Sequence, residues 1–308
     1  MTAAALRSGV LVADKAAGIT SFDVVRLVRR RLRAQRVGHA GTLDPSATGV
    51  LPILIGEATK LMPYLADADK EYVATVRLGV STDTYDLTGR IVAEAPVPPL
   101  DRTALEIAIG PFVGRIRQLP PMYSAVHHEG RRLYEFAREG VEVARQEKEV
   151  VVHAITVEDI ALPEIRLRVV CGKGTYVRSL AADLGAALGC GGAVAGLVRT
   201  RVGAFTLSDA IASAALSTEE PAALWTRVLP PGSALPDWPA VSVDQRRAVA
   251  FVHGQTVEVG VAADGALVRV HDAAGVLLGI GEVLARGSRV KPVRILHADH
   301  QGPRVVSV

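Results

Sequence analysis

The chain has 308 residues, of which 49% are hydrophobic and 22% charged, and its formal net charge is +3. This length fits one large domain or two ordinary ones, and so small a charge is by itself weak support for a nucleic-acid partner. The two cysteines, Cys171 and Cys190, provide neither a disulfide framework nor a CxxC metal motif. We find no signal peptide and no charge-free run of about 18 residues, so we expect a cytoplasmic protein without a membrane span.

The first elements predicted along the chain are a strand at residues 10–13 and a helix that begins after Thr20. Thr20 and Asp23 have the spacing of a capping box, which is typical of a helix start. Apolar residues at helical spacing predict the buried face of this helix, namely Val24, Val25, Val28 and Leu32. The segment 26–36 also contains six arginines. Guanidinium groups suit phosphate oxygens, but a solvated helix face is the plainer alternative.

Residues 38–52 are the most informative segment, with one acidic residue, one histidine, three glycines and two prolines. Because glycine and proline disrupt a helix, we predict a shaped loop that presents Asp44 and His39. Asp44 can serve as a nucleophile, a general base or an electrostatic stabiliser, or it can be an ordinary turn residue before Pro45. A carboxylate in a shaped loop beside dense positive charge favours chemistry on a polyanion.

The rest of the chain alternates strands and helices and then becomes rich in short strands. We predict strands at 71–78, 150–157 and 165–171, a polar turn at 81–89, an extended segment at 118–125, a basic and aromatic stretch at 127–138, a helix at about 176–188 and a linker at 230–239. The pattern excludes an all-α fold. We find no GxSxG elbow, metal-binding carboxylate cluster or Walker loop, which argues against a hydrolase or nuclease.

Several of these segments together resemble one known family. The loop Gly38-His39-x-Gly41-x-Leu43-Asp44-Pro45-x-Ala47-Thr48-Gly49 is similar to the catalytic loop of the TruB family, the tRNA pseudouridine-55 synthases. The other matching blocks follow in family order: Asp14-Lys15-x-x-Gly18-x-Thr20-Ser21, Lys70-x-Tyr72, Pro120-Pro121-x-Tyr123-Ser124-Ala125, Lys173-Gly174-Thr175-Tyr176-x-Arg178 and Leu197. The resemblance covers about residues 10–205. Ala16 and His127 depart from it, since many members have proline and lysine there.

The resemblance implies an α+β fold with a mixed, largely antiparallel sheet and a small β-rich, PUA-like C-terminal domain. We accordingly expect a catalytic domain at 1–230, with an RNA-facing insert at about 118–150, and a second domain at 231–308.

The resemblance also assigns roles to individual residues. It implies that Asp44 is catalytic, that His39 positions the substrate nucleotide, and that Tyr72 stacks on the target base or serves in proton transfer. Arg178 is expected to pair with Asp44, and Leu197 to pack against the base. The expected contacts to the RNA backbone are Arg26, Arg30, Arg31, Arg33, Arg131 and Arg132.

The implied activity is the isomerisation of uridine to pseudouridine in the T-loop of tRNA, with the target base flipped into a pocket. We expect the T-arm as the partner, a monomer with no protein partner, and neither a cofactor nor a metal ion. Asp44 is open to three roles, namely attack at C1′, attack at C6 or removal of a proton from C2′. Two alternatives remain: a noncatalytic tRNA-binding or tRNA-folding protein, and a guide-RNA-dependent synthase.

Overall fold

A ten-stranded sheet runs through most of the computed structural model, which describes residues 7–124, 126–260, 264–284 and 288–296. Its strand order is β14-β1-β3-β12-β4-β11-β10-β7, with β2 beside β3 and β13 beside β12. Its strands are β1 (Gly9–Lys15), β2 (Val37–His39), β3 (Thr48–Ile55), β4 (Lys70–Leu78), β7 (Gly114–Gln118), β10 (Lys148–Ala161), β11 (Glu164–Cys171), β12 (Gly192–Val202), β13 (Phe205–Thr206) and β14 (Ile211–Ala212). All pairs are antiparallel except β1–β14 and β3–β12. The predicted fold class, with a mixed and largely antiparallel sheet, is confirmed.

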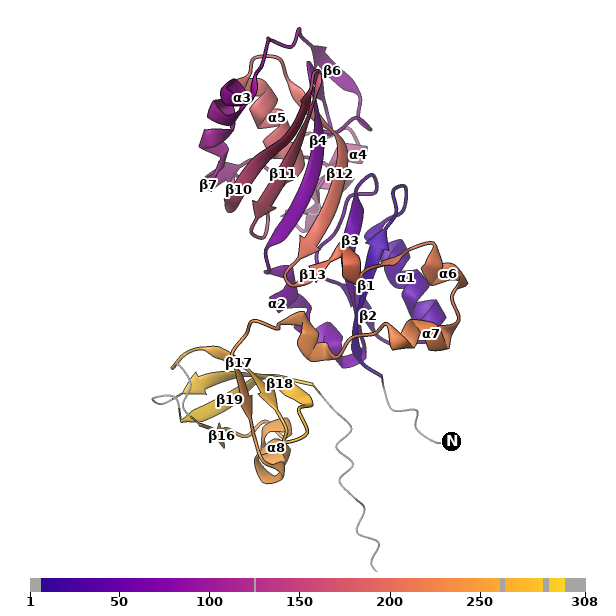
Figure 1. Ribbon diagram of the computed structural model, residues 1–308, viewed down its shortest axis with the longest axis vertical. Helices are drawn as coiled ribbons and strands as arrows, with labels where there is room; N and C mark the ends of the chain where they lie inside the picture. Colours follow the sequence, from indigo (N-terminus) through magenta and orange to yellow (C-terminus); the bar gives the residue numbers. More distant parts are fainter. Residues whose placement is uncertain (1–6, 125, 261–263, 285–287, 297–308) are drawn as a thin grey trace, which may run out of the picture.

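The sheet has two halves that meet at one short seam. The upper half in Figure 1 contains β4, β7, β10, β11 and β12, and the lower half contains β1, β2, β3 and β14. The halves join where β12 pairs in parallel with β3, through Val198 opposite Thr48 and Arg199 opposite Gly49. Gly49 has φ +105°, and a Cβ atom there would lie 2.2 Å from the Arg199 carbonyl oxygen. The seam therefore requires glycine at this position.

Helices and short 3-10 turns pack against the sheet and connect its strands. They are α1 (Ser21–Leu32), α2 (Met62–Ala66), α3 (Arg102–Ile109), α4 (Leu133–Arg138), α5 (Val177–Ala187), α6 (Ala215–Thr218), α7 (Pro221–Thr226) and α8 (Gln245–Val252), with 3-10 turns η1 (Gly56–Leu61), η2 (Gly110–Phe112), η3 (Leu207–Asp209) and η4 (Pro231–Ala234). The predicted capping box is present in α1, since Thr20 accepts from the Asp23 N–H and Asp23 accepts from the Thr20 N–H. Its predicted apolar face is also buried.

Strand β3 is buried on both faces, which explains its nearly continuous apolar sequence. Leu51, Ile53 and Ile55 pack in the core that contains the apolar face of α1. Val50 and Leu54 point to the opposite core, which includes η1 and parts of the C-terminal region. Because β3 is held from both sides, the loop that leads into it starts from a fixed point.

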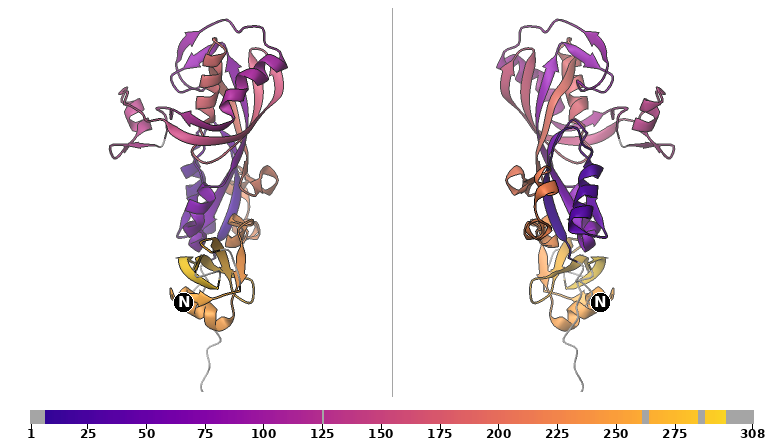
Figure 2. Two further views of the ribbon diagram at one scale, coloured as in Figure 1. Left: turned by 90° about the vertical axis from the view of Figure 1, so that its left-hand side faces the viewer. Right: turned by 90° about the vertical axis from the view of Figure 1, so that its right-hand side faces the viewer.

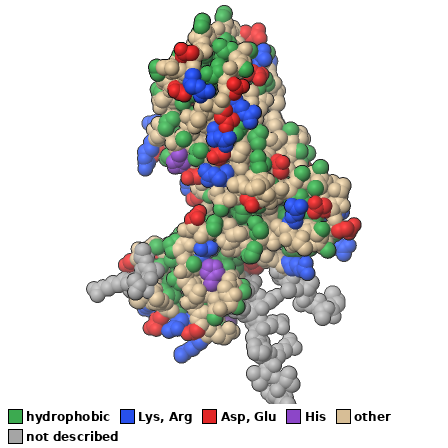
Figure 3. Space-filling model, viewed as in Figure 1, with side chains coloured by type: hydrophobic (Ala, Val, Ile, Leu, Met, Phe, Trp, Pro, Cys, Tyr) green, Lys and Arg blue, Asp and Glu red, His purple; other side chains and the backbone are tan. Residues whose placement is uncertain are grey.

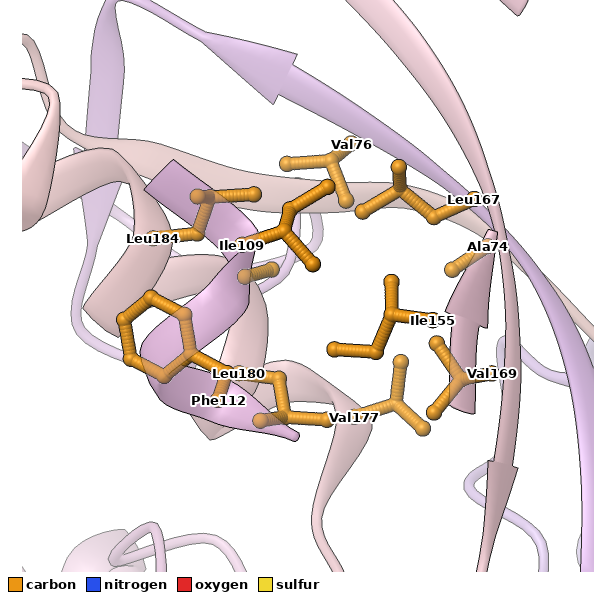
Figure 4. A pocket seen from close by; sticks show the side chains of 11 residues that line it. Ala74, Val76, Ile109, Phe112, Ile155, Leu167, Val169, Val177, Leu180 and Leu184 are labelled. Atoms are coloured by element: carbon orange, nitrogen blue, oxygen red, sulfur yellow. The ribbon is translucent and has the colours of Figure 1, made fainter. Parts of the chain in front are cut away.

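A third core lies under the upper half of the sheet, between the strands and the helices α3 and α5. Figure 4 shows apolar side chains from all three converging there, among them Ile109, Leu180 and Leu167. The gap they leave is a cavity of about 10 Å³. A space of this size with an apolar lining suits no polar ligand, so it is a packing feature of the core.

Two small hairpins extend the upper half. Strands β5 (Val80–Thr82) and β6 (Ile91–Glu94) enclose the turn 83–90, and β8 (His127–His128) and β9 (Arg131–Arg132) lie in the expected insert together with α4. Figure 2 shows the insert projecting sideways from the body as a separate arm. Residue 125, part of the predicted extended segment, lies outside the described residues.

The C-terminal region is β-rich, as predicted. Its five-stranded sheet has the order β15-β17-β18-β19-β16. The strands are β15 (Ala240–Ser242), β16 (Val257–Glu258), β17 (Leu267–His271), β18 (Leu277–Leu284) and β19 (Arg289–Ile295). The expected linker segment is itself packed, since Ala234 and Leu235 are buried in the same core as Val50. The boundary near residue 230 stays a prediction, and residues 297–308 of the expected second domain lie outside the described residues.

Candidate active site

The loop that carries Asp44 occupies residues 40–47, between β2 and β3. It is shorter than the predicted loop, because residues 37–39 pair in antiparallel fashion with residues 53–55, and β3 already begins at Thr48. His39 is therefore the last residue of a strand, and only Asp44 is presented by the loop. The Ser21 hydroxyl accepts from the Leu43 N–H at 2.9 Å and donates to the Leu43 carbonyl at 3.1 Å. The start of α1 thus clamps the loop beside Asp44.

Asp44 and Arg178 form a two-point ion pair at the end of this loop. Arg178 Nε lies 2.8 Å from Asp44 Oδ2, and its Nη2 donates to Oδ1 at 3.0 Å. Two further N–H groups of Arg178 donate to the carbonyl oxygens of Thr84 at 3.0 Å and Tyr123 at 2.8 Å. The Arg178 side chain is 6% exposed and that of Asp44 35%. The arginine is therefore fixed on all sides and sets the direction of the carboxylate.

Opposing influences act on the pKa of Asp44. Burial raises it above the ordinary value, Arg178 lowers it, Asp86 raises it and Lys15 lowers it. The net direction is upward. Asp44 is thus a carboxylate whose ionised form depends on the arginine that faces it.

Asp44 opens into a pocket of about 40 Å³. Strand β12 contributes Val194, Ala195, Gly196 and Leu197 to its lining, and the turn with Asp86, Leu87 and Thr88 adjoins this strand, since the Leu87 N–H donates to the Val194 carbonyl at 2.9 Å. Asp44, Ser46 and Arg178 complete the lining. The structure thus brings three of the predicted site residues, Asp44, Arg178 and Leu197, around one pocket. An anionic group, a guanidinium and an apolar wall suit a ligand that is both planar and polar.

Asp86 is a site residue that sequence reasoning missed. Its side chain is buried, and Oδ1 accepts from the Thr84 hydroxyl at 2.9 Å and the Thr88 N–H at 3.0 Å. Its Oδ2 lies 3.9 Å from Arg178 Nη1. The only sequence signal was a polar turn at 81–89, since its Asp and Thr residues are also ordinary turn formers.

Tyr72 lies on β4, directly opposite Arg199 of β12. It is half-buried and packs, like Leu197, against the cores of both halves of the sheet. Burial raises the pKa of Tyr72, and Arg199 opposes this shift through its charge and a side-chain hydrogen bond. Tyr72 therefore lies at the seam, next to a buried cation that the sequence analysis did not select.

His39 is half-buried at the end of β2. Its Nδ1 is a buried nitrogen without a hydrogen-bond partner in the described part of the chain. Burial and, next, the charge of Arg199 lower the pKa of His39, which favours the neutral ring. A neutral imidazole has one donor and one acceptor nitrogen, and at Nδ1 burial leaves this capacity unused.

The predicted RNA-contacting arginines of α1 are not gathered at this pocket. The helix begins beside the Asp44 loop and runs away from it for 12 residues, or about 18 Å. Arg33 is at its far end. Arg26 forms an ion pair with Asp23, and Arg31 donates to the carbonyl oxygen of Glu219. Arg30 is exposed.

The two arginines predicted in the insert differ from each other. Arg131 forms ion pairs with Glu135 and Glu139 and lies over the Phe136 ring, with 4.4 Å between the guanidinium carbon and the ring centroid. Arg132 is exposed at the start of α4. The strand surface next to the insert shows the same mixture of charges, since Figure 3 displays acidic and basic side chains interspersed over the upper half. The visible face therefore has no single basic patch.

Within the described ranges, no group of three or more His, Cys, Asp and Glu side chains is placed to hold a metal ion. None of the described helices has the length and apolar character needed to cross a membrane.

Comparisons with known proteins agree along the chain. The model of the TruB family pseudouridylate synthase N-terminal domain matches residues 29–177. Two C-terminal models, for tRNA pseudouridylate synthase B and for pseudouridine synthase II TruB, match 178–235 and 239–296.

Proteins named tRNA pseudouridine synthase B are among the similar relatives. The one from Nitrosococcus oceani is 41% identical over 94% of both chains. The one from Methylobacillus flagellatus is 42% identical over 94% of this chain and 95% of its own.

Among solved structures, a Cbf5-Nop10-Gar1 complex matches with a TM-score of 0.73 and 26% identity, covering 94% of this chain and 85% of the matched one. A chain of an H/ACA RNP bound to a substrate RNA containing 2′-deoxyuridine matches with a TM-score of 0.72 and 24% identity, again covering 94% of this chain and 85% of the matched one. This second match shows a similarity of fold. From the family models and the curated relatives it follows that the chain belongs to the TruB family of pseudouridylate synthases.

Proposed function

We propose that this protein converts uridine to pseudouridine in tRNA, at the T-loop position implied by its sequence motifs, with Asp44 as the essential carboxylate. The observation that carries the proposal is the pocket in which Asp44, held at two points by Arg178, faces Leu197. Membership of the TruB family and the names of the curated relatives support tRNA as the substrate.

The reaction is an isomerisation, so every atom of the uridine is kept. The bond from C1′ to N1 breaks, the uracil turns within the pocket, C1′ bonds to C5, and the proton on C5 leaves while N1 gains one. An ionised Asp44 serves this sequence in any of the three ways set out above, as a nucleophile or as a base. Arg178 favours that ionised form and fixes the carboxylate beside the sugar.

The base needs a pocket because it is stacked within the RNA before the reaction. Flipping it out costs a few kcal/mol, which stacking in the protein repays. Leu197 provides an apolar wall, and Tyr72 lies beside it at the seam. We propose that His39, at the end of β2 where the Asp44 loop begins, binds the RNA next to the flipped nucleotide.

We propose that the insert binds the outer part of the T-arm. It projects from the body close to the site, since Tyr123, at its base, accepts a hydrogen bond from Arg178. Shape and backbone contacts of this kind are the usual basis for recognising folded RNA. We propose a monomer in solution, which sedimentation at several concentrations tests.

Incubation of the protein with an unmodified tRNA transcript, without guide RNA or added cofactor, tests the proposal. Wild type is compared with D44N, which keeps the shape of the side chain and removes its charge. Product at the T-loop uridine from wild type only is the expected result. Binding by both proteins without product from either would contradict a stand-alone synthase and favour the guide-dependent or noncatalytic alternative.

A further inference from the structure

Arg199 is a buried arginine that, unlike Arg178, has no acidic partner in the ranges that the structure describes. It lies on β12 at the seam, its side chain is among the largest fully buried ones, and the residue is 1% exposed. Among the described residues, no acidic side chain lies within 4.0 Å of its guanidinium. Removing such a charge from water is costly when no carboxylate compensates for it. The groups that compensate for this charge are therefore backbone carbonyl oxygens and not an acidic side chain.

The contacts of Arg199 converge on the parts of the site. Its Nε donates to the Val50 carbonyl at 2.8 Å, and its Nη2 donates to the Gly41 carbonyl at 3.0 Å. Tyr72 lies directly opposite Arg199 in the strand register, so the two side chains stand on the same face of the sheet. One guanidinium thus connects β3 with the first turn of the Asp44 loop and lies next to the tyrosine at the seam.

The backbone at Gly41 is shaped around this contact. Gly41 has φ +89°, a conformation that favours glycine. A Cβ atom at this position would lie 3.3 Å from Arg199 Nη1 and 3.8 Å from Lys70 Cε. The loop therefore passes close to the guanidinium, and a Cβ atom at Gly41 would require Arg199 to shift by a few tenths of an ångström.

We propose that Arg199 is a positioning residue for the isomerisation, which holds the Tyr72 side chain and the Gly41 end of the Asp44 loop in one fixed arrangement. The inference rests on the proposed function for its link to catalysis, while the arrangement itself is independent of it. Arg199 is absent from the site residues expected from the sequence, because it reaches the loop from a strand 158 positions further along the chain.

The electrostatics agree with this geometry. The groups that act on Tyr72 are Arg199, Cys171 and Asp44, and only Arg199 lowers the pKa of its phenol. A positive charge next to the phenol favours its ionised form, so the Arg199 guanidinium and the Tyr72 ring are electrostatically coupled at the seam.

Kinetic variants test the link to catalysis. We expect R199M to lower the single-turnover rate by about 100-fold, the effect of a misplacement of about 1 Å, with little change in tRNA affinity. R199K keeps the positive charge but loses the planar guanidinium with its several N–H donors, so it should recover part of the rate. R199K also provides the test if R199M does not fold. The matched control is R201M, two residues along the same strand, where Arg201 donates to the Gly203 carbonyl at 3.1 Å. That control should retain the wild-type rate.

A double-variant comparison separates positioning from a general structural effect. If Arg199 acts through Tyr72, then R199M should cost much less in a Y72F protein than in wild type. Equal costs in the two backgrounds would overturn the proposal, as would a wild-type rate in R199M.

A spectroscopic measurement tests the arrangement without any need for activity. In protein labelled with fluorotyrosine, the ¹⁹F resonance of Tyr72 is the one that Y72F removes. We expect R199M or R199K to shift this resonance, R199M to move its titration to higher pH, and R201M to leave it in place. If wild type makes no pseudouridine, the proposed function fails but this measurement still decides the contact. An unchanged Tyr72 resonance in R199M would overturn it.

Discussion

The pocket at the seam and the projecting insert are both proposed to bind RNA, yet they are built in opposite ways. At the seam, the donors of Arg178 and Arg199 bind carbonyl or carboxylate oxygens, and both residues are buried. In the insert, β8 and β9 have two residues each and Arg132 is exposed. A region with few buried contacts opens at low free-energy cost. The comparison indicates that the chemistry takes place on a preorganised site, while the insert adapts to the RNA.

The largest effect should come from R178M, which disrupts the preorganised pocket around Asp44. It leaves Asp44 without its cation and the Thr84 and Tyr123 carbonyls without their donor. Loss of one partner of a buried pair costs about 3–5 kcal/mol, and we expect about 2 kcal/mol here because Asp44 is 35% exposed. The single-turnover rate should fall by about 10³-fold or more, because losses of this size are typical when a group that orients a catalytic residue is removed. Retention of the wild-type rate, with a lowered Tm, would show that Arg178 is only structural.

The rate of the reaction should depend on pH through the Asp44–Arg178 pair. In the folded protein burial raises the pKa of Asp44 and Arg178 lowers it, and the net shift is upward from 3.8. If the reaction needs the ionised carboxylate, its rate should fall as the pH drops through this raised pKa. In R178K part of the lowering influence is lost, so the acid limb of the rate profile should move to higher pH. Single-turnover rates across the acid range measure this limb. An acid limb at the same pH in both proteins would contradict the assignment to Asp44.

A smaller effect is expected in the insert. R132A should weaken tRNA binding a few-fold and reduce the slope of log K against log salt by about 1, if Arg132 contacts one phosphate. R131A should change the slope less, because Glu135 and Glu139 already pair with Arg131. Binding titrations at several salt concentrations measure both. A slower reaction of bound RNA, with an unchanged salt slope, would indicate that the insert acts on the chemistry instead.

The smallest effect should come from helix α1. If the helix contacts the RNA backbone, the double variant R30A/R31A should reduce the salt slope by no more than about 2. The single variant R31A serves as the control, because Arg31 also donates to the Glu219 carbonyl and its loss affects the packing of α1. A double variant with the wild-type salt slope would remove α1 from the RNA-binding surface.

Much of the fold could be predicted because the relevant signals are local. Alternation in β11 buries Ile165, Leu167 and Val169, and the capping box at Thr20 starts α1 where expected. These patterns follow from backbone periodicity and from hydrogen bonds between near neighbours. The bounds predicted for the loop around Asp44 were less accurate, because the pairing of β2 with β3 determines where β2 ends.

Local signals suffice to predict that Asp44 lies in a glycine- and proline-containing loop and that Arg178 lies in the first turn of a helix, since both features depend on neighbouring residues. The contact of Asp86 with Arg178 and that of Arg199 with Gly41 join segments far apart in the chain, and no local signal predicts them. The physical reason is the register at the seam. The pairing of Arg199 with Tyr72 on one side and Gly49 on the other sets which side chains of distant segments meet, and a shift of one residue would turn each of them to the opposite face.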